Sequence, residues 1–272
     1  MSLLSLFSHT IAKEDFVFFD VETTGFYPLA GDRIIEIAMI RCSKGNVTGT
    51  LEVMFNPGIP IPEEASRVNK ITDDMLADKP HFDKEIGTQI VEFIGDSILV
   101  AHNASFDIGF LSFELARTGI IYRDWKAIDT LKMSQKLFPN QKNKLESLMR
   151  RYNIMPEGDL HRALIDTDSL KKVFFELINE SDIRNKTLEV LIREFGLAGV
   201  NIHKFIPARI REAMVDGTAL SGSYKKRNGE IIELNIMPVA PVWSAKKWYL
   251  IAKDIKENTI LSINAANFNI KD

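Results

Sequence analysis

Five side chains that can bind cations or carry protons lie in three short segments of this chain. Asp20 and Glu22 end an apolar run, Asp107 follows a second apolar run, and His161 and Asp166 share a third segment. Carboxylates bind hard divalent cations, and a histidine accepts protons near neutral pH. If the three segments meet in the fold, they can form a metal-dependent hydrolytic site.

Asp20 and Glu22 interrupt what is predicted to be a buried strand. Side chains two residues apart on a strand point to the same face, so both carboxylates project together at its carboxyl end. Burying two like charges side by side is unfavourable unless a cation joins them. The pair therefore indicates a metal site, unless the strand ends at Phe19 and both acids are solvated.

Asp107 closes the segment HNASFD, which follows an apolar run ending at Ala101. Asn103 or Ser105 can cap the helix that begins there, and this leaves Asp107 in its first turn. An acid at that position either belongs to the metal site or interacts only with the helix dipole.

His161 and Asp166 lie in the segment HRALIDTD. Five residues of a regular helix place two side chains about 140° apart, so these two converge only if His161 precedes the helix and Asp166 lies inside it. Gly158, just before them, permits that arrangement. Asp168 is expected to face away from Asp166. Taken alone, His161 would be an ordinary loop histidine.

Four acids and one histidine, each at a strand end or a helix start, suit two divalent cations held about 4 Å apart. Mg²⁺ or Mn²⁺ is expected, because a single cysteine, Cys42, and five histidines make zinc a poor fit. Such ions clamp the attacking and leaving oxygens of a displacement at phosphorus, while a neutral histidine deprotonates the attacking water.

The three segments resemble the exonuclease motifs of the DnaQ-like superfamily, histidine subtype. The matching stretches are FVFFDVETTG (16–25), HNASFD (102–107) and HRALID (161–166). This superfamily includes the proofreading ε subunit of bacterial DNA polymerase III, RNase T and oligoribonuclease. The resemblance covers roughly residues 15–180. It implies an RNase H-like fold and 3′→5′ hydrolysis of nucleic acid to nucleoside 5′-monophosphates.

The same resemblance implies a role for each of the five side chains. Asp20, Glu22 and Asp166 correspond to ligands of the catalytic metal, and Asp20 and Asp107 correspond to the side that holds a second metal. His161 corresponds to the general base. The implied cofactor is a pair of Mg²⁺ or Mn²⁺ ions.

Three further residues, Thr23, Glu64 and Asn69, correspond to positions that lie along the terminal nucleotide of the substrate. Asn69 stands where ε-like members have a histidine. The contact with the terminal nucleotide is therefore expected to differ from the family pattern, whereas the chemistry is not.

The motifs require a sheet whose strand ends meet helix starts. Strands are predicted at 16–22, 33–41, 47–55, 97–101 and 125–128, with the second and third forming a hairpin through the turn Lys44-Gly-Asn. Helices are predicted from Pro62, over 105–118 and over most of 130–180. A hairpin followed by strand–helix alternation indicates an α/β fold, here an RNase H-like mixed sheet flanked by helices.

Beyond residue 181 the pattern changes. Two helical stretches, 185–195 and 207–215, precede strands at 219–225, 231–237, 248–253 and 259–263. Pro238 is expected to end the second of these strands. We therefore predict an exonuclease domain at 1–183, a helical linker at 184–207 and a small β-rich domain at 208–272.

The β-rich part resembles the WYL domain, an SH3-like barrel found in bacterial regulators and some nucleic-acid enzymes. The resemblance rests on Tyr224, Pro238 and Trp248-Tyr249-Leu250, and it covers roughly residues 208–270. The ending Asn267-Phe-Asn-Ile departs from the family's ligand-contact pattern.

Aromatic and basic side chains of this part allow two interpretations each. Trp243, Trp248 and Tyr249 are expected in its core rather than as stacking platforms for bases. Lys225 to Arg227 and Lys246-Lys247 are either solvated turns or a surface that follows a phosphate backbone.

Composition limits the class of protein. With 45% hydrophobic and 26% charged residues, the chain is expected to fold into soluble globular domains. An unbroken apolar run long enough for a membrane helix is absent, and Met1 to Phe7 is too short for a signal peptide, so a cytoplasmic protein is expected. Residues 181–272 contain 14 Lys and Arg against 10 Asp and Glu, whereas residues 1–180 contain 20 against 27.

The sequence thus predicts a metal-dependent 3′→5′ exonuclease acting on single-stranded ends, with DNA favoured over RNA. An RNA-trimming enzyme of the same superfamily is one alternative, because the site residues do not contact the sugar selectively. A nucleic-acid-binding regulator without activity is the other, although the complete set of acids with His161 argues against it. A role in proofreading or DNA repair would require a separate polymerase partner.

Overall fold

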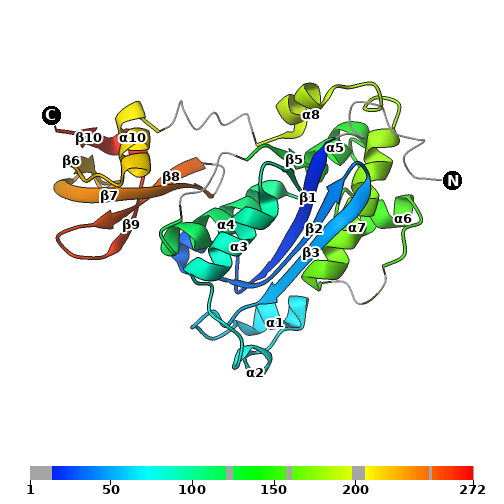
Figure 1. The fold of residues 1–272 in the computed structure, drawn as a ribbon, viewed down its shortest axis with the longest axis horizontal. Coiled ribbons are helices and arrows are strands. Elements are labelled where there is room, and N and C mark those ends of the chain that lie inside the picture. The colour runs from blue at the N-terminus through cyan, green and yellow to red at the C-terminus, as the bar shows by residue number, and fades with distance from the viewer. Residues whose placement is uncertain are drawn as a thin grey trace.

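The structure, a computed structural model, describes residues 14–120, 125–156, 158, 161–197, 206–244 and 247–271 (Figure 1). Ten strands are described: β1 (Asp15–Thr23), β2 (Ile34–Ser43), β3 (Asn46–Met54), β4 (Ile98–Ala101), β5 (Ala127–Asp129), β6 (Leu220–Lys225), β7 (Ile231–Ser244), β8 (Lys247–Asp254), β9 (Ile260–Ile263) and β10 (Phe268–Ile270). They form two five-stranded sheets, with the orders β3-β2-β1-β4-β5 and β10-β6-β7-β8-β9. The predicted mixed sheet and the second, antiparallel β domain are both confirmed.

The described helices lie between these strands along the chain. The described ones are α1 (Glu63–Asn69), α2 (Asp73–Leu76), α3 (Lys84–Ile94), α4 (Ala104–Arg117), α5 (Thr130–Leu137), α6 (Leu145–Arg151), α7 (Ala163–Asn179), α8 (Leu188–Phe195) and α10 (Ala208–Asp216), with short 3₁₀ turns η3 (Pro28–Ala30) and η4 (Ala265–Asn267). Figure 1 shows α3 and α4 on one side of the first sheet and α6 and α7 on the other.

Strand β1 lies at the centre of the first sheet and has a buried core on each face. Its residues Phe16 and Phe18 pack with Phe174 of α7, the ring centroids lying 5.3 and 5.4 Å away. Val17 and Phe19 face the other way, into the core that includes residues of α3 and α4. A strand covered on both faces explains the unbroken apolar run that the sequence shows.

The hairpin of β2 and β3 turns at Lys44 and Gly45, both with positive φ, as a two-residue hairpin turn requires. Strands β4 and β5 then add in parallel to β1 and to each other. The parallel arrangement brings the carboxyl ends of β1, β4 and β5 to one edge of the sheet, where the helices that follow β4 and β5 begin.

The expectation that Pro238 ends a strand is wrong. Strand β7 continues to Ser244 and is the central strand of the second sheet, with a register shift between Pro238 and Ala240. The shift is a bulge, which lets a residue without an N–H lie inside a ladder. A further strand, β10, was not predicted.

Part of the predicted linker packs with the first domain. Leu188, Leu191 and Phe195 of α8 are buried in the same core as Phe16 and Phe174. The second domain in turn contacts α4, where Phe113 and Ala116 pack with Val242 of β7 and Ile251 of β8. Helix α4 therefore belongs to the core of one domain and to the interface with the other.

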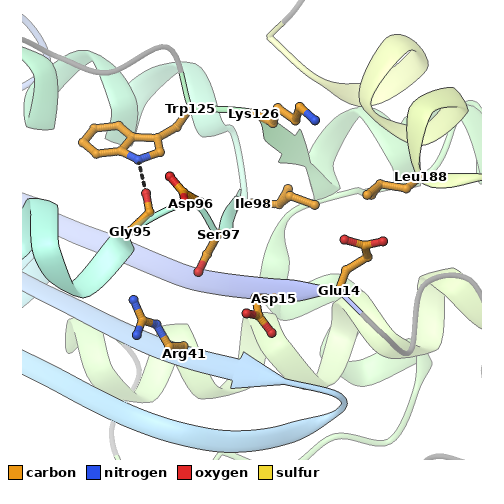
Figure 2. Close-up of a pocket in the computed structure, with 10 residues that line it drawn as sticks. All are labelled: Glu14, Asp15, Arg41, Gly95, Asp96, Ser97, Ile98, Trp125, Lys126 and Leu188. Carbon is orange, nitrogen blue, oxygen red and sulfur yellow. Dashed lines mark hydrogen bonds between the residues drawn. The ribbon is translucent and has the colours of Figure 1, made fainter.

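A hollow of about 700 Å³ lies at the amino ends of β1 and β4, opposite the strand ends that carry the predicted site. Figure 2 shows the residues that line it. Asp15, Ser97 and Ile98 lie along it, and Trp125 donates a hydrogen bond to the Gly95 carbonyl at 2.9 Å.

Among the described helices, no apolar segment is long enough to span a membrane.

Candidate active site

Three carboxylates meet at the carboxyl end of β1. Asp20 and Glu22 of β1 and Asp166 of α7 each offer an oxygen within 4.8 Å of the others, and all three are half-buried. This is the one group of three or more potential metal ligands among the described residues. The prediction that strand spacing places Asp20 and Glu22 together is thus confirmed.

The packing of α7 on β1 explains why Asp166 reaches this position. Every second residue of β1 points to the face that α7 covers. This set contains Phe16, Phe18, Asp20 and Glu22. Phe174 covers the two phenylalanines. Asp166 precedes Phe174 by about two helical turns, so it lies over the acidic end of the same face.

Asp107 approaches from the opposite side, in the first turn of α4. Its charge raises the pKa of Asp20 more than the charges of Glu22 and Asp166 do. The predicted cap of α4 differs, because Asn103 has a left-handed φ of 72° and its side chain makes no capping bond. Instead, the Asp129 carboxylate accepts the Asn103 N–H at 2.9 Å, tying α4 to the end of β5.

Burial raises the pKa of Asp20, Glu22, Asp107 and Asp166, and repulsion from neighbouring carboxylates adds to this effect. Burial, followed by repulsion from Asp107 and Glu22, holds the pKa of Asp20 well above its usual range. Burial, followed by repulsion from Asp166, raises the pKa of Glu22 to about 8. Burial also raises the pKa of Asp107 to about 8 and raises the pKa of Asp166. A nearby positive charge would stabilise the ionised form of these four carboxyl groups, and none of them supplies one.

His161 lies just before α7, as its spacing from Asp166 requires. It adopts a left-handed φ of 67°, and its backbone N–H donates to Asp166 Oδ2 at 3.2 Å. Its ring Nε2 lies 3.7 Å from Glu146 Oε1 of α6, and 45% of the side chain is exposed. Asp168 faces elsewhere, forming ion pairs with Lys171 and Lys172.

His102, the other histidine of the motifs, forms a hydrogen bond that connects two elements of the first domain. Its Nδ1 lies 2.9 Å from Thr130 Oγ1 at the start of α5. Burial lowers its pKa to about 4. The neutral ring therefore joins the β4–α4 turn to α5.

The three residues predicted along the terminal nucleotide lie in different environments. Thr23 is buried at the end of β1, and its hydroxyl donates to the Gly25 carbonyl at 2.6 Å. Glu64 is exposed in the first turn of α1. Asn69 is buried, and its amide donates to the Thr23 carbonyl at 3.4 Å and accepts the Ile71 N–H at 3.0 Å. Asn69 thus holds the end of α1 to the end of β1.

An ion pair with a fully buried carboxylate, which the sequence did not suggest, supports the start of α7. Glu36 of β2 pairs directly with Glu22 in the strand register, and its side chain is fully buried. Its carboxylate accepts from Arg162 Nη2 at 2.8 Å and from the Ala163 N–H at 3.0 Å. These bonds fix the junction between His161 and α7. Their partners lie 126 and 127 residues apart in the chain, so no local pattern indicates them.

The residues present fit a site for hard divalent cations. Oxygen donors alone make up the cluster, which is the preference of Mg²⁺ and Mn²⁺. Arg162, whose charge lowers the pKa of Glu22, is bound to Glu36. A bound divalent cation would let the crowded carboxyl groups ionise together.

Comparison with known proteins agrees with this geometry. The family described as an exonuclease, RNase T, matches residues 17–174. The DNA polymerase III subunit epsilon of Rickettsia conorii is 40% identical over 168 residues, which are 60% of this chain and 73% of that protein. The PolC-type DNA polymerase III of Bacillus cereus is 35% identical over 171 residues, 62% of this chain but only 12% of the polymerase.

Two solved structures are similar in fold. Exonuclease X in complex with 5′ overhanging duplex DNA has a TM-score of 0.51 at 26% identity, covering 65% of this chain and 98% of that chain. The nuclease domain of 3′hExo, a DEDDh family member bound to rAMP, has a TM-score of 0.55 at 16% identity, with the same coverage. The family match ends before the second sheet begins.

The raised pKa values generate a prediction for the metal-free protein. Because the folded-state pKa of Glu22 and of Asp107 is about 8, the folded protein retains protons that the unfolded chain releases near pH 4 to 5. The free energy of unfolding should therefore fall as pH rises from about 5 to 8. Thermal unfolding in EDTA should give a lower Tm at pH 8 than at pH 6, and Mg²⁺ should raise Tm more at pH 8.

Asp20→Asn is the matched variant for this measurement. Removing one charge relieves the repulsion, so the variant should melt at a higher temperature than the unaltered protein in EDTA at pH 8. It should also gain less from Mg²⁺. The same Tm for both proteins at pH 8, with and without Mg²⁺, would show that the carboxylates neither repel one another nor bind the ion.

The Glu36–Arg162 pair generates a second prediction. Arg162→Ala leaves a fully buried carboxylate with one backbone donor, so the free energy of unfolding should fall by about 2–3 kcal/mol. Arg150→Ala is the control, because its pair with Glu146 is exposed and should contribute under about 1 kcal/mol. Urea unfolding measures both. Equal losses for the two variants would contradict the structural role of Glu36.

Proposed function

Since the chain belongs to the RNase T exonuclease family, a family of 3′→5′ exonucleases, we propose that it removes nucleotides from single-stranded 3′ ends and that DNA is its preferred substrate. The product is a nucleoside 5′-monophosphate. The observation that carries this proposal is the cluster of Asp20, Glu22 and Asp166 at the end of β1, with Asp107 on the opposite side.

We propose that the four carboxylates hold two Mg²⁺ or Mn²⁺ ions. Asp20, Glu22 and Asp166 would bind one ion, and Asp20 and Asp107 the second. When bound, such ions stabilise the charge that develops on the oxygens around the reacting phosphorus. The half-buried position of the cluster supports this role, because charges interact more strongly where water is partly excluded.

His161 is the proposed general base. Its position before α7, beside Asp166, supports this assignment, and the exposed ring can turn from Glu146 toward the carboxylates. There it would take the proton from the attacking water. The Glu36–Arg162 pair would position the base by fixing the backbone next to it.

The terminal nucleotide is proposed to lie against Thr23 and Glu64. Asn69 would act indirectly, because its hydrogen bond to the Thr23 carbonyl fixes the end of β1. A preference for DNA is supported by two relatives that are DNA polymerase III proteins, and by the similarity to exonuclease X bound to DNA. The same relatives support association with a separate DNA polymerase, as a proofreading or repair nuclease.

The domain plan is also proposed: an exonuclease domain at 1–183, a segment at 184–207 that includes α8, and a WYL-type domain at 208–272. The WYL assignment is supported by Tyr224, Pro238 and Tyr249 on β6, β7 and β8. The side chains of Trp243 and Trp248 lie outside the described residues.

Digestion of 5′-labelled single strands tests the function. With Mg²⁺, a DNA strand should shorten stepwise from its 3′ end and release nucleoside 5′-monophosphates, faster than an RNA strand of the same sequence. Asp20→Ala and Asp166→Ala should abolish shortening, because each removes charge that holds a cation. Near-full activity of either variant would refute the site. Faster RNA shortening would favour the RNA-trimming enzyme, and binding without shortening would favour the inactive regulator.

His161→Gln tests the general base. Turnover should fall by about 10²- to 10⁴-fold while binding of the 3′ end is kept, since the carboxylates remain. The acidic limb of the pH–rate profile should disappear in this variant. His81→Gln, an exposed histidine whose Nδ1 contacts the Asn56 carbonyl, is the control. If the acidic limb persists in His161→Gln, another group provides the base.

A further inference from the structure

A second hollow, of about 650 Å³, lies between the two domains. Tyr27 and Leu29, in the segment that follows β1, form its side in the first domain. Tyr224, Arg227 and Tyr249 of the second domain lie across from them. Neither domain alone encloses this hollow, so it exists only because α4 packs on β7 and β8.

The side chains around this hollow match the chemistry of a nucleotide. Three tyrosines from separate segments, Tyr27, Tyr224 and Tyr249, offer aromatic faces on which bases stack. Lys226 and Arg227 offer positive charge, and no carboxylate belongs to the described residues that line the hollow. Tyr249, which the sequence placed in the core, is only half-buried.

Arg227 is the cation best placed to receive a phosphate. Lys226 already pairs with Glu230 at 3.1 Å. Arg227 is exposed and forms no ion pair with any described residue. A guanidinium binds phosphate oxygens with two parallel N–H groups, so a free arginine beside aromatic rings suits a sugar–phosphate chain.

Exposed rings connect the hollow with the carboxylate cluster. Phe26 and Tyr27 are 76% and 62% exposed, and their ring centroids lie 6.4 Å apart. Phe26 also lies 6.4 Å from Phe106, which precedes Asp107 in α4. Two neighbouring exposed aromatic side chains in a soluble domain indicate a binding surface.

The segment that carries these rings is held firmly. A Cβ atom on Gly25 would lie 2.3 Å from the Asp32 carboxylate, so the close approach of Asp32 requires glycine there. That carboxylate accepts the Tyr27 N–H at 2.9 Å. Beside it, the Thr24 N–H donates to the Arg33 carbonyl at 2.9 Å, and the Thr24 hydroxyl oxygen accepts the Arg33 N–H at 3.0 Å. The rings therefore project from a fixed loop directly after the acids of β1.

We propose that the interdomain hollow binds a nucleotide of the substrate strand on the 5′ side of the cleaved bond, with Arg227 on a phosphate and the tyrosines against a base. This inference rests on the proposed function, because it takes the strand to be the substrate. A strand is favoured over a free nucleotide because the row of exposed rings continues from the cluster to the hollow. The first 180 residues carry an excess of acids, so attraction for a polyanion must come from elsewhere in the chain.

Binding of a fluorescent twenty-nucleotide DNA strand, measured by anisotropy in EDTA, tests the proposal apart from hydrolysis. Arg227→Ala should weaken binding about tenfold and lower the slope of log affinity against log salt by about one unit. Tyr27→Ala should also weaken binding about tenfold, but with an unchanged salt slope, because stacking releases no counterions. Both side chains are exposed, and circular dichroism would confirm that each variant is folded.

Lys256→Ala is the matched control. It removes a cation from another turn of the same sheet, where Lys256 is 85% exposed and does not line the hollow. It should bind the strand as the unaltered protein does. In Mg²⁺, the ratio of kcat/KM for the long strand to that for a dinucleotide should fall about tenfold in Arg227→Ala.

The outcomes separate this inference from the proposed function. Identical affinity and salt slope for Arg227→Ala and Lys256→Ala would overturn the strand-binding role and leave the hollow to a protein partner or a free nucleotide. If the unaltered protein binds the strand through Arg227 but releases no nucleotide in Mg²⁺, the exonuclease proposal fails while the binding site stands.

Discussion

Repulsion among carboxylates at the end of one central strand is the constraint on which the rest of the structure depends. Asp20 and Glu22 share a face of β1, and Asp166 and Asp107 approach them from two helices. Isolated acids in such a position would move apart or remain in water. They stay together because β1 is paired on both sides, with β2 and with β4, so its backbone cannot shift away.

Two ion pairs whose carboxylates are fully buried hold the helices that carry the other acids. Glu36 of β2 binds Arg162 at the start of α7. Arg33, just before β2, binds Glu114 of α4 through two bonds of 2.5 and 2.9 Å, and Glu114 also accepts the Ile34 N–H. The helices that carry Asp166 and Asp107 are therefore both anchored at β2, the strand next to β1. Buried pairs add little net stability, but their geometry is strict, which suits a site that needs fixed distances.

Local sequence patterns predicted the elements of the first domain and the shared face of Asp20 and Glu22, because strand and helix periods are local properties. The meeting of this pair with Asp166 followed only from the resemblance to the exonuclease motifs. Local patterns did not predict the partners of Glu36 and Glu114, which lie 126 and 81 residues away. Two further features were not predicted, because each depends on a neighbouring strand. The bulge at Pro238 depends on the pairing of β7 with β8. The left-handed conformation of Asn103 depends on the carboxylate of Asp129, at the end of β5. Local propensity is overridden at such places by tertiary bonds.

Helix α4 links the two parts of the molecule more closely than the sequence suggested. Its first turn carries Asp107, and its last turns carry Phe113 and Ala116, which pack against Val242 and Ile251 of the second sheet. A side chain larger than that of Ala116, which is 2% exposed, would have to separate the sheet from the helix. Because one rigid helix spans both contacts, the second sheet is held at a set distance from the carboxylates. Whatever the interdomain hollow binds is therefore held at a set position relative to the acids of β1, by the packing of α4 together with the loop that carries Tyr27.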